Sequence, residues 1–365
     1  MISLLLLFLC LVAIVVFVRR GITGEDLSVY DSPKEPLWVD QPASAEHAEV
    51  EEQFCRIAPE IAKLPKKQLM LAMRQKMDDW GVRQPVKAQV QPAVGAAVAG
   101  DWILAEGADP NKRLLYIHGG AFMLGGPQSH RILTAKLSEI SGAAVFAVDY
   151  RLCPENRLLD CLDDCQRAYR WLIDHGPQGQ APADQLFVVG DSAGGNISLV
   201  LLSWIRDQLL PAPTAAVALS PTVDGTLSSP SIVKNLGTDR MLRPMLEAVV
   251  KSPRALLLTA TWLVNRVRPI DPRVSPIHGD LSNLPPLLIQ ASSSECLEDD
   301  ARRFTNKARA AGSPVKLQLW SNMMHVWQMF EPELDEAKEA FEQIRVFLEQ
   351  VCAAEKDEGH DEKLQ

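Results

Sequence analysis

A serine set among small residues could carry nucleophilic chemistry in this chain. The run GDSAG spans residues 190–194 and places Ser192 two residues from a glycine on either side. The pattern G-x-S-x-G matches a nucleophile elbow, a sharp turn from a strand into a helix that exposes a serine hydroxyl. Taken alone, five such residues more often form a plain glycine-rich turn, because short runs of small residues are common. The segments around them must decide.

An apolar strand and an apolar helix are predicted to flank Ser192. The run QLFVVG at 185–190 predicts a buried strand, and ISLVLLSWIRDQLL at 197–210 predicts a helix. This strand–turn–helix order is the one that an elbow requires, and Gly190 and Gly194 leave room for the tight turn. The serine hydroxyl would lie at a helix N-terminus, where the helix dipole favours developing negative charge. We therefore predict that Ser192 is a nucleophile.

A nucleophilic serine needs hydrogen-bond donors that hold the oxyanion formed on the attacked carbonyl. Backbone N–H groups of small residues suit this task, because no side chain blocks the substrate. The run HGGAF at 118–122 directly follows a predicted strand. We predict His118 to be a hydrogen-bonded scaffold of this loop rather than a second base. The predicted donors are the backbone amides of Gly119, Gly120, Ala121 and Ala193.

A base and an acid should follow the serine, in the order serine, acid, histidine. Among the seven histidines, only His325 and His360 come after the last predicted strand, and His360 lies in a charged tail. His325 is therefore the predicted base. In SSSECLEDDARRF, Glu295 is the first acid after the preceding strand and is the predicted triad acid, with Asp299 as the alternative. A carboxylate there would fix the imidazole tautomer and stabilise the imidazolium.

Strands and helices alternate along the part of the chain that carries these residues. Near-continuous apolar strands between helices predict an α/β fold, with a mostly parallel sheet and helices on both faces. Two further strands are predicted at 86–98 and 101–106, after helices within 46–80. Between 223 and 276 the alternation stops, which indicates a helical insertion over one end of the sheet. The predicted strands of the alternation are 113–119, 143–150, 185–190, 214–220, 286–292 and 315–320.

Composition limits the classes of function. The 365 residues are 47% hydrophobic and 23% charged, which is typical of a globular protein. The formal charge of −9 argues against nucleic-acid binding, which needs clustered Lys and Arg. The seven cysteines show no disulfide or zinc spacing, although Cys161 and Cys165 share a helix face. We interpret them as free core thiols in a reducing compartment, and no metal or organic cofactor is implied.

The first eighteen residues, MISLLLLFLCLVAIVVFV, are almost wholly apolar, and Arg19 and Arg20 follow. A helix of that length spans about 27 Å, enough to cross a bilayer. No basic stretch precedes the apolar run and no A-x-A-like cleavage site follows it, so we favour a retained single-pass anchor over a cleaved signal peptide. The two arginines place the catalytic domain on the cytoplasmic side, and secretion after cleavage is the alternative.

Several motifs together resemble one family, the hormone-sensitive-lipase-like branch of the α/β-hydrolases. These carboxylesterases carry an HGG oxyanion motif and a GDSAG elbow, and the resemblance covers about 114–348. Two positions depart from the family pattern. Ala121 stands for the third glycine of H-G-G-G, and Glu295 stands for the aspartate of a D-P-L-x-D-E run. The matching segments are HGGAFMLGGPQSHR, DYRLCPENRLLDCLDDC, GDSAGGN, DPRVSPIHGDLSNLPPLLIQ and HVWQMF.

The resemblance implies an α/β-hydrolase fold with a helical cap and a serine hydrolase that cleaves short- to medium-chain carboxylic esters. Ser192, Glu295 and His325 would be catalytic, and a small-molecule ester would be the partner. A lactone or amide hydrolase, or a catalytically silent binding protein of the same fold, is the alternative. The oligomeric state stays open, a homodimer included. The expected organisation is an anchor at 1–20, a linker and part of the cap at 21–85, a catalytic domain at 86–352 with a cap insertion near 223–270, and a polar tail at 353–365.

Overall fold

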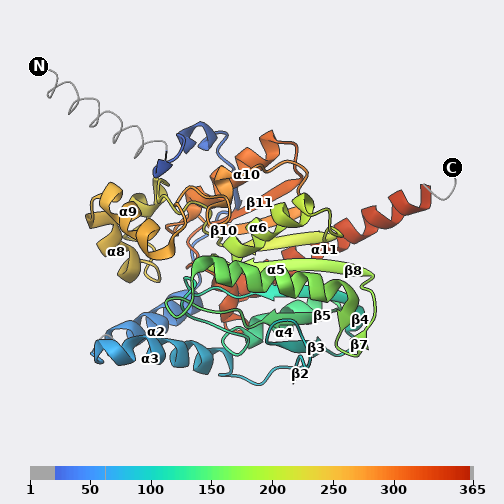
Figure 1. The fold of residues 1–365 in the computed structure, drawn as a ribbon. Helices are drawn as coiled ribbons and strands as arrows, with labels where there is room; N and C mark the ends of the chain where they lie inside the picture. The colour runs from blue at the N-terminus through green and yellow to red at the C-terminus, as the bar shows by residue number, and fades with distance from the viewer. Residues whose placement is uncertain (1–20, 62, 362–365) are drawn as a thin grey trace, which may run out of the picture.

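A nine-stranded mixed sheet forms the centre of the described chain (Figure 1). The structure is a computed structural model and describes residues 21–61 and 63–361. The order across the sheet is β1-β11-β10-β9-β8-β4-β5-β3-β2. Its strands are β1 (Leu37–Val39), β2 (Ala88–Pro92), β3 (Gly100–Ala105), β4 (Asp109–Ile117), β5 (Ala143–Val148), β8 (Gln185–Asp191), β9 (Ala215–Leu219), β10 (Leu287–Ser292) and β11 (Val315–Trp320). A small hairpin pairs β6 (His175–Gly176) with β7 (Gly179–Gln180).

In the spatial order of the sheet, the seven strands from β1 to β5 are parallel, as the alternating pattern predicted. The last two, β3 and β2, pair antiparallel at one edge. Every residue of β5, β9 and β10 is buried. Continuous apolar strands are needed here, because helices cover both faces of the sheet. The carboxyl ends of the parallel strands therefore meet at one edge, where loops from distant parts of the chain come together.

Two layers of helices cover the sheet. Helices α5, α6 and α10 pack on one face, and α4 and α11 pack on the other. Their apolar side chains form separate cores with alternate residues of the same strands, so that Leu115 faces one layer and Leu114 the other. The long helices of the two layers are α4 (Arg131–Ser141), α5 (Leu158–Asp174), α6 (Ser192–Asp207), α10 (Glu298–Ala310) and α11 (Asp335–Asp361).

The predicted insertion between β9 and β10 is helical. It contains α7 (Ser231–Lys234), α8 (Arg243–Lys251) and α9 (Arg254–Asn265). Two earlier helices, α2 (Ala45–Ile61) and α3 (Lys66–Gly81), lie at the same end of the molecule (Figure 1). Arg240 joins the two groups, since its guanidinium forms ion pairs with Glu51 and Glu52 of α2 at 3.3 and 2.8 Å. Three short 3-10 helices complete the fold: η1 (Leu27–Tyr30), η2 (Pro276–His278) and η3 (Trp327–Phe330).

The segment expected to be a linker is part of the fold instead. Strand β1 pairs parallel with β11 and adds an edge to the sheet. Side chains of α10 fix the residues before it, since Arg303 forms an ion pair with Asp31 at 2.6 Å and the Asn306 amide donates to the carbonyls of Tyr30 and Pro33. The strand has only three residues, too few for an alternating pattern to reveal it.

Most of the polar tail predicted at 353–365 belongs to a helix. Helix α11 continues past residue 353 to Asp361. Glu355 is held against the body of the protein, because its carboxylate accepts hydrogen bonds from Gln185 at 3.2 Å and Thr214 at 3.5 Å. The anchor predicted at residues 1–20 lies outside the described residues. Within 21–61 and 63–361, no helix is both long and apolar enough to cross a membrane.

Candidate active site

The turn from β8 into α6 presents Ser192 in a constrained backbone conformation. Ser192 has a φ of +51°, in the left-handed region that few residues other than glycine adopt. Gly190 and Gly194 make this turn possible. A Cβ on Gly190 would lie 2.5 Å from the Gly194 carbonyl oxygen, and one on Gly194 would lie 2.0 Å from the Ile117 carbonyl oxygen. The turn is the strand–turn–helix elbow that the sequence indicated, and strain of this kind is typical of functional sites.

Ser192, His325 and Glu295 form one hydrogen-bonded chain. The Ser192 hydroxyl lies 2.9 Å from His325 Nε2, and His325 Nδ1 lies 2.6 Å from Glu295 Oε2. Glu295 is fully buried and His325 is 3% exposed. The three residues follow β8, β10 and β11, whose carboxyl ends lie at one edge of the sheet. The arrangement has the geometry of a nucleophile, a base and an orienting acid.

Glu295 holds charge beside the imidazole of His325. Burial lowers the pKa of His325, but the hydrogen bond and the negative charge of Glu295 outweigh it, with smaller contributions from Asp239 and Asp191. The pKa of His325 therefore lies above its ordinary value. The other oxygen of Glu295 accepts the Ser292 N–H at 2.8 Å, so the carboxylate has a fixed orientation.

The alternative acid, Asp299, faces away from His325. Its carboxylate accepts the Ser231 N–H at 2.8 Å and lies 3.8 Å from the Arg302 guanidinium. It therefore ties the start of α10 to α7 of the insertion. Of the two acids that the sequence left open, only Glu295 contacts the histidine.

Three residues support the loop that carries His325. The Met324 N–H donates to His47 Nε2 at 3.0 Å, and the Ser292 hydroxyl donates to the Met323 carbonyl at 2.7 Å. The Ser220 hydroxyl accepts the N–H of the residue after His325 at 3.3 Å. Sequence reasoning missed His47, because nothing in α2 indicates a contact nearly 280 residues along the chain. Ser220 and Ser292 lie at the ends of predicted strands, and this position is the sequence feature that could have indicated their role.

In the loop after β4, Gly119 differs from the prediction that four backbone amides are free to act as oxyanion donors. The Gly119 N–H donates to Asp191 Oδ1 at 2.8 Å and is therefore engaged within the protein. Among the described residues, no acceptor takes the N–H of Gly120 or Ala121. Ala193 is the second residue of α6, where a helix leaves its N–H groups without a partner in the helix. Three backbone amides thus remain as candidate donors.

Asp191 is the residue that fixes the loop after β4. It is 1% exposed, and besides Gly119 it accepts the Tyr116 hydroxyl at 2.5 Å and lies 3.5 Å from His130 Nε2. Burial raises the pKa of Asp191, but the charge of His130 and the hydrogen bonds of its three partners outweigh this and keep the pKa below its usual value. A Cβ on Gly119 would lie 2.1 Å from the Asp191 carboxylate, so only glycine fits there. The sequence contained a signal for this residue, since it directly precedes Ser192.

His118 lies beneath the same loop and is not a second base. Its ring stacks on Tyr150, with 4.2 Å between ring centroids, and its Nδ1 lies 2.8 Å from the Gly119 carbonyl oxygen. Burial, together with the charge of His130, lowers the pKa of His118 to about 3. The ring is therefore neutral, with the Nδ1 proton donated to Gly119, and it acts as a scaffold.

The described residues contain no cluster of His, Cys, Asp and Glu that could hold a metal ion. Cys55, Cys153, Cys161, Cys165 and Cys296 form no disulfide, and the last three of them are buried.

Comparison with known proteins identifies the family. A model of the alpha/beta hydrolase fold matches residues 114–329, more than half of the chain. The chain belongs to the α/β-hydrolase family. Similar curated α/β-hydrolases include an acetyl-hydrolase of Streptomyces hygroscopicus, 37% identical over 68% of this chain and 78% of that protein, and an esterase of Acinetobacter venetianus, 36% identical over 71% and 81%.

Solved structures place this α/β-hydrolase in the hormone-sensitive-lipase-like branch of carboxylesterases. The crystal structure of an esterase from the bacterial hormone-sensitive lipase family is 32% identical, with a TM-score of 0.72, and it covers 85% of this chain and 99% of that one. An esterase/lipase from an uncultured bacterium is equally similar, with a TM-score of 0.72 and 32% identity over 85% of this chain and 100% of that one. The family resemblance predicted from the sequence motifs is thus confirmed.

Replacing Glu295 by Gln should lower kcat and shift the pH profile of the hydrolase. Catalysis needs neutral His325, so the acidic limb of kcat/KM reports the pKa of that residue. In wild type this limb should lie above about pH 6.5, the ordinary histidine value. Glu295→Gln removes the charge that raises this pKa, so the limb should move to lower pH, and kcat should fall roughly 10³- to 10⁴-fold. Steady-state kinetics from pH 5 to 9 would measure both effects.

Asp299→Asn is the matched control for Glu295→Gln, because it removes a neighbouring carboxylate that does not contact His325. Its acidic limb should stay where the wild-type limb lies. An unshifted limb in Glu295→Gln, or a shifted one in Asp299→Asn, would contradict the assignment of the acid.

Replacing Asp191 by Asn should lower kcat more than it raises KM. The change weakens the charge-assisted hydrogen bond to Gly119, and such bonds contribute about 1.5–3 kcal/mol. The loop that carries Gly120 and Ala121 would then lose its fixed position. We expect kcat to fall at least tenfold, which initial rates on a p-nitrophenyl ester would measure.

Tyr116→Phe is the control for Asp191→Asn. It removes another donor to the same carboxylate oxygen and leaves the Gly119 N–H bond in place. Its effect on kcat should be clearly smaller. Wild-type kcat in a folded Asp191→Asn protein would show that Asp191 does not position the loop.

Proposed function

We propose that this protein is a serine hydrolase that cleaves carboxylic esters through an acyl-enzyme, with Ser192 as the nucleophile. The observation that carries the proposal is the hydrogen-bonded chain from Ser192 Oγ to His325 Nε2 and from His325 Nδ1 to Glu295. The protein belongs to a family in which similar members are named as esterases and an acetyl-hydrolase.

In the first half of the reaction, Ser192 Oγ attacks the ester carbonyl carbon while His325 Nε2 takes the hydroxyl proton. The imidazolium that forms is stabilised by the buried carboxylate of Glu295. The carbonyl oxygen gains negative charge and is held by the amides of Gly120, Ala121 and Ala193. Each such donor contributes about 10²- to 10³-fold to kcat. His325 then gives its proton to the leaving alcohol.

The second half repeats these steps with water. His325 takes a proton from a water molecule, the resulting hydroxide attacks the acyl-serine, and the same amides hold the second oxyanion. The proton returns to Ser192 Oγ as the acid leaves.

The insertion and the N-terminal helices form a cap over the site in this proposal. The support is that both groups contact the loops that carry the proposed catalytic residues. His47 of α2 accepts the Met324 N–H beside His325, and Asn235 after α7 donates to the carbonyl of Glu295. Such caps shape the acyl pocket and exclude water. The name of the similar acetyl-hydrolase supports short acyl chains, and we propose short- to medium-chain esters as substrates.

Residues 1–20 anchor the protein in a membrane in this proposal, with the catalytic domain on the cytoplasmic side. The support is the apolar run of eighteen residues followed by two arginines. Photolabelling of the protein by lipids in a bilayer tests the anchor, because it shows whether peptides from residues 1–20 carry the label.

Ser192→Ala should abolish hydrolysis of p-nitrophenyl acetate and p-nitrophenyl butyrate, because among the described residues only the Ser192 hydroxyl is hydrogen-bonded to His325 Nε2. Rates should fall at least about 10⁴-fold, leaving only the contribution of binding and the oxyanion donors. Initial rates measure this, and a fluorophosphonate probe should label the wild type and not the variant. Labelling and activity near wild type in Ser192→Ala would overturn the mechanism. A wild type that neither reacts with the probe nor hydrolyses any ester would favour a silent binding protein.

A further inference from the structure

One face of α9 exposes a stripe of apolar side chains. Leu256, Leu263 and Val264 are 67%, 68% and 75% exposed, and Ala260 between them is also exposed. The four positions follow the spacing i, i+4, i+7, i+8, which lies along one side of a helix. The other side of α9 packs inward through Leu258, which is 1% exposed. Among the described residues, nothing covers the stripe.

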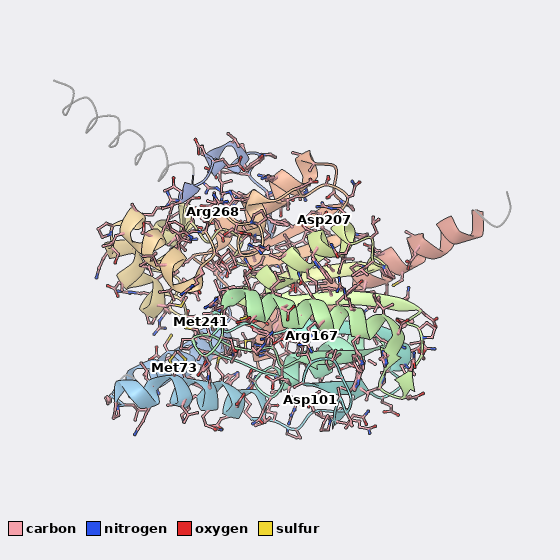
Figure 2. The ribbon with its side chains drawn as sticks, in the orientation of Figure 1. Met73, Asp101, Arg167, Asp207, Met241 and Arg268 are labelled. Carbon is pink, nitrogen blue, oxygen red and sulfur yellow. The ribbon has the colours of Figure 1, made fainter. Side chains whose placement is uncertain are left out.

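Basic residues at the two ends of α9 form a rim beside this stripe. Residues 240–273 carry seven Lys or Arg against two Asp or Glu, although the whole chain has a formal charge of −9. Three of the seven are in ion pairs: Arg240 with Glu51 and Glu52, Lys251 with Glu247, and Arg273 with Asp271. Arg254 at the first position of α9 and Arg266 and Arg268 just beyond its end are exposed. Figure 2 labels Arg268 on this side of the molecule, where the insertion meets the N-terminal residues. The charge pattern is complementary to an anionic surface.

The described chain begins close to the segment that follows α9. Ile22 is 2% exposed, and a Cβ on Gly24 would lie within 3 Å of Ile270, which follows α9, and of His278 in η2. The almost wholly apolar residues 1–18 precede it in the sequence. The segment proposed to enter a bilayer therefore joins the protein near the segment that follows α9.

We propose that α9 lies on the surface of an anionic lipid bilayer, with its apolar stripe among the acyl chains nearest the headgroups. Arg266 and Arg268 would then contact lipid phosphates, whereas the Arg254 guanidinium donates to the carbonyl and hydroxyl oxygens of Thr226. A helix with an apolar face and flanking basic residues is the usual interfacial element of a membrane-bound protein. The proposed anchor explains why a bilayer is close, whereas the stripe and the rim are features of α9 itself. Apolar esters concentrate in lipid, so this contact holds the cap where such substrates are most abundant.

The test uses the full chain in vesicles of phosphatidylcholine and phosphatidylglycerol that contain a phosphatidylglycerol with a photoactivatable acyl chain. After irradiation and digestion, mass spectrometry locates the labelled peptides. Label should appear on α9 and on residues 1–20. Peptides that contain Val94 or Leu209, which are 93% and 92% exposed but stand alone, should stay unlabelled.

The double variant Leu256→Gln, Leu263→Gln should reduce labelling of α9 at least several-fold and leave residues 1–20 labelled. Its rate on soluble p-nitrophenyl acetate should equal the wild-type rate, which shows that the variant is folded. Leu209→Gln is the matched control, because it changes a leucine outside α9 that is even more exposed and should leave the pattern unaltered. Raising the salt concentration should weaken labelling of α9, since the rim acts through charge.

Each outcome separates the two membrane proposals. Label on residues 1–20 without label on α9 would overturn the surface proposal and leave the anchor in place. Label on α9 alone would support the surface and overturn the anchor, and no label on either would overturn both. An unlabelled α9 in a dimer that the double variant dissociates, measured by light scattering, would assign the stripe to a second copy of the chain instead.

Discussion

The constraint on which the site depends is the turn that brings Ser192 from β8 into α6. Two glycines allow that turn, because their missing side chains would otherwise meet backbone oxygens at 2.5 Å or less. The turn places the serine hydroxyl at the carboxyl edge of a parallel sheet. The loops after β10 and β11 begin at the same edge, so His325 contacts the serine and Glu295 contacts His325. In this ester hydrolase, the strand order thus brings together residues that are more than 130 positions apart.

Two buried carboxylates, Glu295 and Asp191, each fix one part of the site around this turn. Glu295 orients His325 and raises its pKa, whereas Asp191 accepts the Gly119 N–H in the loop that carries two of the proposed oxyanion donors. Both are almost completely removed from water, where an unpaired charge would be very costly. Each is stable because several donors converge on it. The same donors make the two loops rigid, which places the proton transfer and the oxyanion in a fixed relation to the serine.

The sequence predicted the fold, and its candidate residues Ser192, Glu295 and His325 meet in the structure, because each follows a strongly apolar strand. The order of the residues along the chain and their position after an apolar strand can be read from the sequence, and in a parallel sheet they determine where the residues lie. The sequence did not reveal that the Gly119 N–H turns inward, since the direction of an amide depends on the side chain that packs against it. His47 and the short strand β1 were missed for a related reason: their partners lie about 280 residues away and are chosen by packing.

The most direct measurement of the central claim is a crystal structure of the protein after reaction with a p-nitrophenyl alkylphosphonate, which mimics the tetrahedral intermediate. The phosphorus should be bonded to Ser192 Oγ. Its charged oxygen should lie about 2.7–3.1 Å from the amide nitrogens of Gly120, Ala121 and Ala193, with the Gly119 N–H still bonded to Asp191. A phosphonate on another residue, or an oxygen directed away from these amides, would contradict the account.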